Sequence, residues 1–289
     1  MTGSTVRTRD GRALTYEEHG DPSGRPVILM HGTPGSRLGP IPRASRLYPL
    51  GVRVITYDRP GYGGSDHLPE RFVAHAAADA ADLADALGIE RFAVVGRSGG
   101  GPHALACAAL LPDRVVRAAA LVSIAPYAPM DRERWFAGMS EGNRIEYSAA
   151  EAGREKLEAL LGELGSLIRE DPEAHLPFDR AELTRADRAV MADFGIRGMM
   201  RANFGEAMRV SADGWIDDTL SFVRPWGFDP AAIAVPVRLW HGTEDVHSPV
   251  AHTEWLSARI AQANTVIQSG AGHFASIAEI LRTLSWLIA

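Results

Sequence analysis

The sequence has almost no cysteine or lysine and no long apolar run. Among its 289 residues there is one cysteine, Cys107, and one lysine, Lys156. A single cysteine excludes an intrachain disulfide and a zinc site built from several thiolates. No segment reaches the roughly 18 uninterrupted apolar residues of a membrane span, and the first residues lack the apolar part of a secretory signal. We therefore expect a cytoplasmic protein without a membrane partner.

Basic charge is also scarce. The 30 lysines and arginines are outnumbered by 36 aspartates and glutamates, which gives a net charge of −6 at pH 7. This balance gives no general attraction to phosphate backbones, so nucleic acid is not an expected partner. The glycine cluster at 61–64 lacks the third glycine of G-x-G-x-x-G, and no Gly-Lys-Ser or Gly-Lys-Thr occurs. We expect no nucleotide and no other cofactor.

Short apolar runs alternate with helical segments over most of the chain. This alternation implies right-handed crossovers and predicts an α/β fold with a mostly parallel, doubly wound sheet. The predicted strands are 6–8, 14–18, 27–30, 52–57, 92–95, 118–124, 235–240 and 265–268. The predicted helices are 38–50, 72–87, 103–111, 250–263 and 274–287.

One long segment departs from this alternation. Residues 130–230 contain amphipathic helical stretches, such as 151–168, but no convincing strand. We predict that 1–129 and 231–289 form the core domain and that 130–230 is an inserted, all-helical cap. About a third of its large apolar side chains are expected to face a ligand. These side chains are Trp135, Phe136, Met139, Met191, Phe194, Met199, Met200, Phe204, Met208, Trp215 and Phe222.

A serine stands where an apolar strand passes abruptly into a helical segment. The sequence there is Gly-Arg-Ser-Gly-Gly, with Ser98 at the apex and glycines at 96 and 100. A strained turn of this kind leaves no room for side chains on either flank and lifts the serine hydroxyl clear of the sheet. The helix that follows directs its free NH groups toward an oxyanion at this point.

A serine nucleophile needs a base and an acid, which in a parallel sheet come from loops at the carboxyl ends of strands. Asp245 follows the predicted strand 235–240, and His273 follows 265–268 after a run of small residues. Glu244 is a close competitor for the acid. His241 and His247 flank Asp245 but complete no recognised set of metal ligands, so no metal is expected.

From about residue 14 to 287 the chain resembles the α/β-hydrolase superfamily, specifically its serine hydrolases with a helical cap. Four motifs occur in that family's order: 31–35 (His-Gly-Thr-Pro-Gly), 58–65 (Asp-Arg-Pro-Gly-Tyr-Gly-Gly-Ser), the Ser98 turn, and the loops of Asp245 and His273. The resemblance implies that Ser98 attacks an acyl carbonyl, His273 serves as general base and then acid, and Asp245 stabilises the imidazolium.

The resemblance also implies an oxyanion hole. One donor is the NH of Gly99, and the other is that of Thr33, because Pro34 has no NH to offer. His31, Gly32, Gly96 and Gly100 are expected to support these loops, and Gly99 to leave room near the reacting carbon.

Two residues keep alternative interpretations. Some members of the family take the acid from an earlier strand, which would point near Asp131 instead of Asp245. Arg97 departs from the residues usual before the serine. We expect it to form a salt bridge beneath the turn, and contact with a substrate carboxylate is the alternative.

The function implied by the resemblance is hydrolysis of carboxylic esters of small to medium apolar substrates through an acyl-enzyme. Lactonase, thioesterase, C–C bond hydrolase and proline-iminopeptidase-like activities are alternatives on the same residues. A proline-iminopeptidase-like activity needs acidic groups that bind the free amino terminus of a peptide. The cap offers Glu206, Asp213, Asp217 and Asp218 for this purpose. A non-hydrolytic ligand-binding homologue is the alternative of another class. The sequence does not indicate the oligomeric state.

Overall fold

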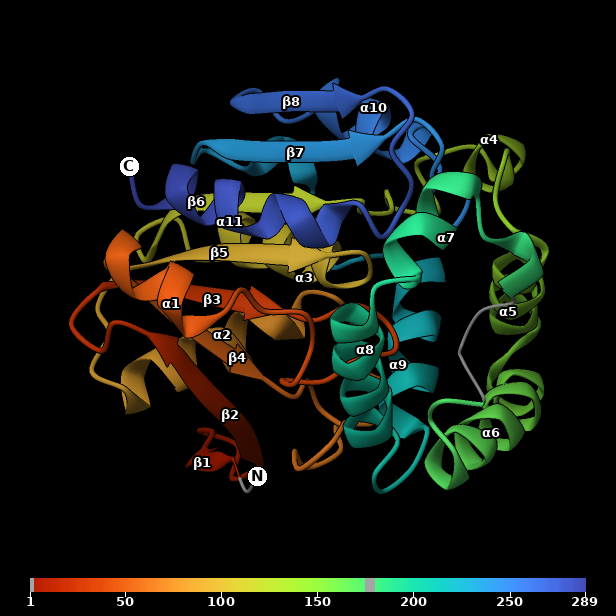
Figure 1. Cartoon of the computed structure of the whole chain (residues 1–289), viewed down its shortest axis with the longest axis horizontal. Coiled ribbons are helices and arrows are strands. Elements are labelled where there is room, and N and C mark those ends of the chain that lie inside the picture. Colours follow the sequence, from red (N-terminus) through yellow and green to blue (C-terminus); the bar gives the residue numbers. More distant parts are fainter. Residues whose placement is uncertain (1–2, 175–179) are drawn as a thin grey trace.

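The computed structural model describes residues 3–174 and 180–289, and its described strands form one eight-stranded sheet in the order β1-β2-β4-β3-β5-β6-β7-β8 (Figure 1). β1 and β2 pair antiparallel, as do β2 and β4, and every other pair is parallel. The predicted α/β fold with a mostly parallel sheet is confirmed. The strands are β1 Ser4–Arg7, β2 Ala13–Gly20, β3 Arg25–Met30, β4 Val52–Tyr57, β5 Phe92–Arg97, β6 Val115–Leu121, β7 Val237–Gly242 and β8 Ala263–Gln268.

Helices cover both faces of the sheet, because its central strands are apolar on both sides. One face packs against α2 His75–Ala86, α3 Gly100–Leu110 and α10 Ala251–Ser257, and the other against α1 Ala44–Leu47 and α11 Ser276–Leu287. All six residues of β5 are buried, which fixes the strand that leads to Ser98 at the centre of the molecule. No helix of the described residues is long and apolar enough to cross a membrane.

Three predicted elements differ from the observed ones for local reasons. The helix expected at 38–50 is reduced to α1 and a 3-10 turn, Tyr48–Leu50, because Pro40 and Pro42 lack an NH and disfavour helix in the residue before them. The helix expected at 151–168 is divided at Gly153, where φ is 115°. The strand expected at 118–124 ends at Leu121, since φ turns positive at Val122.

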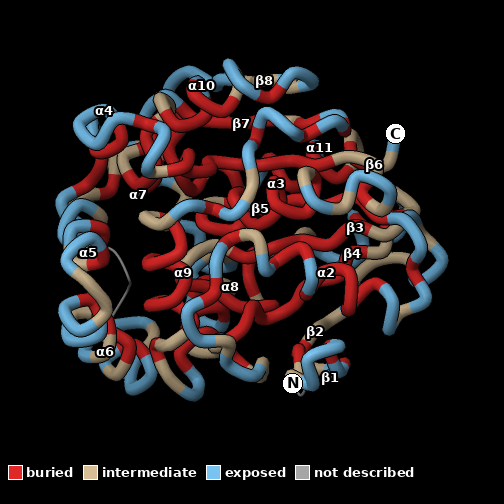
Figure 2. The backbone as a smooth tube through the Cα atoms, turned by 180° about the vertical axis from the view of Figure 1, so that it is seen from behind, coloured by how far each residue is buried: buried red, intermediate tan, exposed pale blue. Residues whose placement is uncertain are grey.

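Between β6 and β7 the chain forms the α4–α9 segment, and its described residues contain no strand. It comprises α4 Arg132–Phe136, α5 Glu141–Ala152, α6 Arg154–Glu170, the 3-10 turn Arg180–Glu182, α7 Arg185–Met191, α8 Phe194–Ala207 and α9 Asp213–Val223, and a 3-10 turn, Pro230–Ala232, follows. The segment lies at the carboxyl ends of the parallel strands (Figure 1). α9 is buried along its length, whereas the outer sides of α5 and α6 are exposed (Figure 2). The division into domains at 130 and 230 stays a prediction.

A carboxyl group lies between two helices of this segment. Glu146 on α5 accepts hydrogen bonds from Trp215 Nε1 at 2.9 Å and from Thr219 Oγ1 at 2.7 Å, both on α9. Burial of this carboxyl group raises its pKa to about 7, and the two hydrogen bonds oppose the shift only in part. Part of the side chain remains open to solvent.

Glu146→Gln should therefore remove a pH dependence of stability. Between the usual pKa of 4.5 and the folded value of about 7, the folded protein keeps a proton that the unfolded chain releases. The free energy of unfolding then falls as pH rises through this window. Urea midpoints across this window should fall more for the native protein than for Glu146→Gln. Glu155→Gln, on the exposed side of α6, is the matched control, and equal slopes in all three proteins would contradict the prediction.

Candidate active site

Ser98 occupies a sharp turn between β5 and α3. Its φ is 54°, in the left-handed region that a serine rarely adopts. A Cβ at residue 96 would overlap the carbonyl oxygen of Gly100, and one at residue 100 would overlap that of Met30. The two glycines therefore allow β5, the turn and the start of α3 to approach closely enough to hold Ser98 in this conformation.

His273 and Asp245 lie in neighbouring loops after β8 and β7. His273 Nδ1 is 2.8 Å from Asp245 Oδ2, and Asp245 Oδ1 accepts the NH groups of His247 at 2.8 Å and Ser248 at 3.0 Å. Burial opposes ionisation of Asp245, but His273 and His241 outweigh it and hold its pKa well below the usual range. The Asp245 carboxylate is thus charged and its orientation is fixed.

Neither competing carboxylate takes this position. Glu244 is exposed, and Asp131 caps α4 by accepting the NH of Arg134. The structure therefore pairs His273 with Asp245 and not with Glu244 or Asp131.

A second histidine contacts Asp245, a role that no local sequence pattern indicates. His241 Nε2 lies 3.2 Å from Asp245 Oδ2 and 2.5 Å from the carbonyl oxygen of Ser248. Two acceptors at Nε2 require the proton there, and Nδ1 lies 2.7 Å from Thr253 Oγ1. Among the residues that the structure describes, no three His, Cys, Asp or Glu side chains are grouped to hold a metal ion.

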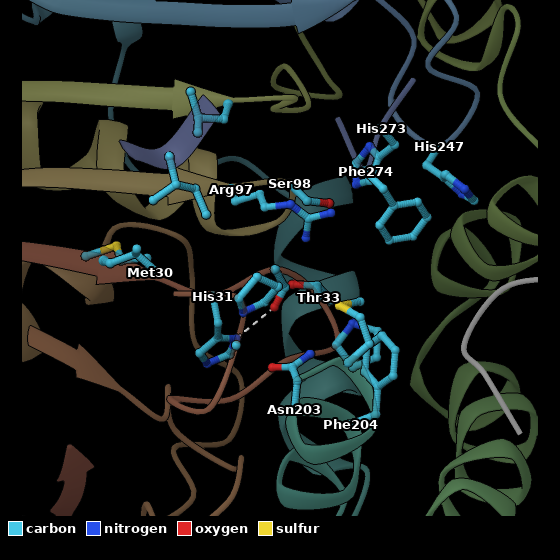
Figure 3. A pocket seen from close by; sticks show the side chains of 18 of the residues that line it. Met30, His31, Thr33, Arg97, Ser98, Asn203, Phe204, His247, His273 and Phe274 are labelled. Carbon is cyan, nitrogen blue, oxygen red and sulfur yellow. Dashed lines mark hydrogen bonds between the residues drawn. The ribbon is translucent and has the colours of Figure 1, made fainter. Parts of the chain in front are cut away.

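Ser98 and His273 line one cavity, of about 80 Å³ (Figure 3). Within residues 3–174 and 180–289 the Ser98 hydroxyl makes no hydrogen bond to His273. Such contacts often tighten only when substrate binds. Of the eleven large apolar side chains expected to contribute, Met200 and Phe204 line the cavity, which is fewer than the predicted third. Phe194 is instead 83% exposed.

Thr33 and Gly99, the predicted oxyanion donors, are adjacent. A Cβ at residue 99 would overlap Thr33 Oγ1. Glycine at 99 thus lets the Thr33 side chain approach, and the expectation that Gly99 leaves space near the reacting carbon stays a prediction. Neither NH group donates a hydrogen bond to the described part of the chain, so both are available to an oxyanion.

His31 and Gly32 shape the loop that precedes Thr33. His31 Nε2 accepts the NH of Arg59 at 3.1 Å, so Nδ1 carries the proton and donates to the carbonyl of Gly32 at 2.7 Å. Burial, followed by the charge of Arg59, lowers the pKa of His31 well below its usual range. A neutral His31 therefore braces the loop.

A buried carboxylate from α9 holds this loop from the other side. Asp218 accepts hydrogen bonds from Thr33 Oγ1 at 2.6 Å, Tyr62 Oη at 2.9 Å, Arg59 Nη2 at 2.5 Å and Arg71 Nη1 at 2.6 Å. Burial opposes the charge of Asp218, but Arg59 and Arg71 hold its pKa well below the usual range.

Arg59 also contacts the loop directly. It donates to the carbonyl of His31 and, at 3.0 Å, to that of Gly32. Arg59 therefore supports the loop of Thr33. His103 lies with Nδ1 2.7 Å from the carbonyl oxygen of Gly99, and burial lowers its pKa to about 3.

The four acidic residues considered for binding an amino terminus do not line the cavity. Asp218 pairs with Arg59 and Arg71, and Asp217 pairs with His67 and Arg154. Glu206 pairs with Arg37 and Arg209, and Asp213 accepts from Ser211 at 2.9 Å.

A second carboxylate of the α4–α9 segment, which the sequence analysis missed, holds the His273 loop. Asp187 on α7 is fully buried and accepts the NH of His273 at 3.1 Å and that of Phe274 at 2.8 Å. A Cβ at residue 272 would overlap the Asp187 carboxylate, so Gly272 permits this approach. The threonine-to-aspartate spacing from Thr184 to Asp187, typical of a capping box, was the one local signal.

The salt bridge expected beneath the turn is not found. No carboxylate of the described residues forms an ion pair with Arg97, whose Nε instead donates to Ser276 Oγ at 2.8 Å. The two carboxylates whose charges act on Arg97 have other partners: Asp245 binds His273, and Asp187 binds two backbone NH groups.

Fold and site together define a member of the alpha/beta hydrolase fold family, whose family model matches residues 25–279, and the chain belongs to that family. It is 28% identical over 274 residues to a non-heme chloroperoxidase of Streptomyces lividans, covering 93% of this chain and 91% of that one. It is 37% identical to a proline iminopeptidase of Xylella fastidiosa over 109 residues, 36% of this chain and 34% of that one. An alpha/beta hydrolase fold protein of Nakamurella multipartita superposes with a TM-score of 0.67 at 25% identity, covering 99% of each chain.

Asp218→Asn should destabilise the protein strongly. The change leaves the guanidinium groups of Arg59 and Arg71 buried without their shared carboxylate, at a cost of about 3–5 kcal/mol in the free energy of unfolding. Urea denaturation measures this loss. Tyr62→Phe removes one hydrogen bond to the same carboxylate and should cost about 1 kcal/mol. Asp213→Asn, at the half-exposed first residue of α9, is the control, and a loss in Asp218→Asn no larger than in this control would contradict the role of Asp218.

Asp187→Ala should lower kcat, because the His273 backbone loses its carboxylate support. A misplacement of His273 by about 1 Å is enough to cost on the order of 100-fold in rate. KM should change much less, since Asp187 does not line the cavity. Asp193→Ala, which removes the acceptor for the NH of Ile196 at the start of α8, is the matched control. Equal kcat values in the two variants would argue against a positioning role for Asp187.

Proposed function

We propose that this protein is a serine hydrolase that cleaves carboxylic esters of small substrates through an acyl-enzyme. The observation that carries the proposal is the hydrogen bond of 2.8 Å between His273 and a buried, charged Asp245, beside a cavity that His273 shares with Ser98. Membership of the alpha/beta hydrolase fold family supports hydrolase chemistry.

In the proposed reaction Ser98 Oγ attacks the ester carbonyl and His273 Nε2 takes its proton, because Nδ1 is already engaged by Asp245. The Asp245 carboxylate stabilises the imidazolium that forms. The NH groups of Thr33 and Gly99 receive the oxyanion. His273 then protonates the leaving alcohol. Water next gives a proton to His273 and attacks the carbonyl of the acyl-enzyme, and Ser98 leaves with that proton as the acid is released.

Supporting roles are proposed for the residues around these groups. Gly96 and Gly100 permit the strained turn at Ser98, and His31 with Gly32 orients the loop of Thr33. A donor lost from an oxyanion hole typically costs about 3–4 kcal/mol of transition-state stabilisation, so the position of Thr33 matters as much as the acid.

Residues 130–230 are proposed to act as a cap that limits substrate size. Met200 and Phe204 of α8 line the cavity together with Phe274. The volume of about 80 Å³ favours short acyl groups of esters, lactones or thioesters and excludes polymers. An aminopeptidase-like activity is less well supported, because Glu206, Asp213, Asp217 and Asp218 lie outside the cavity lining.

Covalent labelling tests the proposal. A fluorophosphonate should form one adduct on Ser98, identified by intact mass and peptide mapping. Ser98→Ala should lose the adduct and reduce turnover of p-nitrophenyl acetate on the order of 10⁵- to 10⁶-fold. Ser45→Ala changes an exposed serine on α1 and is the control, which should keep both the adduct and the turnover. A folded protein with no adduct and no turnover would favour the non-hydrolytic binding protein instead.

A further inference from the structure

Arg97 is a buried cation without a carboxylate partner among the described residues. It is 8% exposed, and its described hydrogen bond is the one from Nε to Ser276 Oγ at 2.8 Å. Its Nη2 atom is buried and has no hydrogen-bond partner in the described part of the chain. The guanidinium carbon lies 5.4 Å from the centroid of the Phe274 ring, a contact that supports a cation but does not neutralise it.

The guanidinium group lies at the wall of the proposed active-site cavity. Arg97 lines that cavity together with Ser98 and His273 (Figure 3). A Cβ built at Gly32 would stand 3.5 Å from Ser98 Cβ and 3.7 Å from Arg97 Nη1, so both side chains face the same point of the loop. The charge is therefore adjacent to the proposed nucleophile.

A buried guanidinium without a counter-ion is costly, and proteins usually pair such a group. Burial lowers the pKa of Arg97 to about 10, with Asp245 and Asp187 opposing the shift, so the group stays charged at neutral pH. Asp245 is bound to His273, and Asp187 to two backbone NH groups. No carboxylate of the described residues therefore serves as the counter-ion, and the adjacent cavity leaves room for one carried by a ligand.

Building on the proposed function, we propose that Arg97 binds a carboxylate carried by the acyl group of the substrate, which makes short half-esters of dicarboxylic acids the preferred substrate class. The planar guanidinium matches a carboxylate in shape and charge. The leaving alcohol must lie toward His273, which protonates it. Arg97 Nε is held by Ser276 on that side, whereas Nη1 points toward the loop of Gly32, which receives the carbonyl oxygen, so we place the carboxylate on the acyl group. Hydrolysis of such a half-ester consumes water and releases a dicarboxylate, an alcohol and a proton.

A matched pair of esters tests this assignment. The acyl groups of monomethyl succinate and methyl levulinate have the same length. The first ends in a carboxylate and the second in a neutral acetyl group. The native protein should prefer the charged ester in kcat/KM, and Arg97→Gln should reduce that preference on the order of 10- to 100-fold. Arg97→Lys should restore part of it. Arg46→Gln, an exposed arginine on α1, controls for net charge and should leave the ratio unchanged.

Three results would overturn the proposal. The first is an equal fall in kcat/KM for both esters in Arg97→Gln, and the second is a native protein that does not prefer monomethyl succinate over methyl levulinate. The third is a native protein that prefers, of the charged esters, only O-acetylglycolate, whose carboxylate lies on the alcohol side. Arg97→Gln is expected to fold with undiminished thermal stability, because it removes an uncompensated charge.

Calorimetry with Ser98→Ala separates this proposal from the proposed catalysis. That variant should bind monomethyl succinate, and the additional Arg97→Gln change should raise the dissociation constant on the order of 10-fold or more. Arg97-dependent binding without a fluorophosphonate adduct in the native protein would mean that the hydrolase assignment alone fails. Binding that is the same with and without Arg97 would overturn the role of Arg97.

Discussion

The buried charge cluster around Asp218 is the interaction on which the rest of the site depends. One carboxylate from α9 pairs with two guanidinium groups, those of Arg59 and Arg71, and also accepts the hydroxyl hydrogen of Thr33. Arg59 in turn donates to two carbonyl groups of the loop that ends at Thr33. Because buried ions tolerate few alternative arrangements, this cluster fixes the loop relative to the turn of Ser98.

The helical segment therefore does more than cover the sheet. Asp218 holds the loop of Thr33, and Asp187, from another helix of the same segment, holds the backbone at His273. Both contacts are buried, and both join elements far apart in sequence, since Asp218 is 159 positions from Arg59 and Asp187 is 86 positions from His273. A change in how this segment packs would consequently move both loops, so in the proposed enzyme substrate size and catalytic geometry would not be independent.

Local sequence patterns were sufficient for the strands, the Ser98 turn and the order of the loops, because each is specified by neighbouring residues. The apolar run of β5 followed by glycines at 96 and 100 leaves the chain few alternatives. The partners of Asp218, Asp187 and Arg97 could not be predicted in this way. A buried aspartate has the same local signature whether it caps a helix, pairs with arginine or receives backbone NH groups, and only the tertiary packing distinguishes these outcomes.

The unpaired charge of Arg97 has a consequence for catalysis in the proposed complex. When His273 takes the proton from Ser98 it becomes a second cation in the same small cavity, and repulsion from a bare guanidinium opposes this step. A carboxylate bound to Arg97 would cancel that repulsion, so it would favour the transition state as well as the binding of the ester. For a neutral ester the repulsion remains. Discrimination between the two classes of ester is therefore expected to arise in kcat as well as in KM, because the carboxylate offsets a charge that develops only during the reaction.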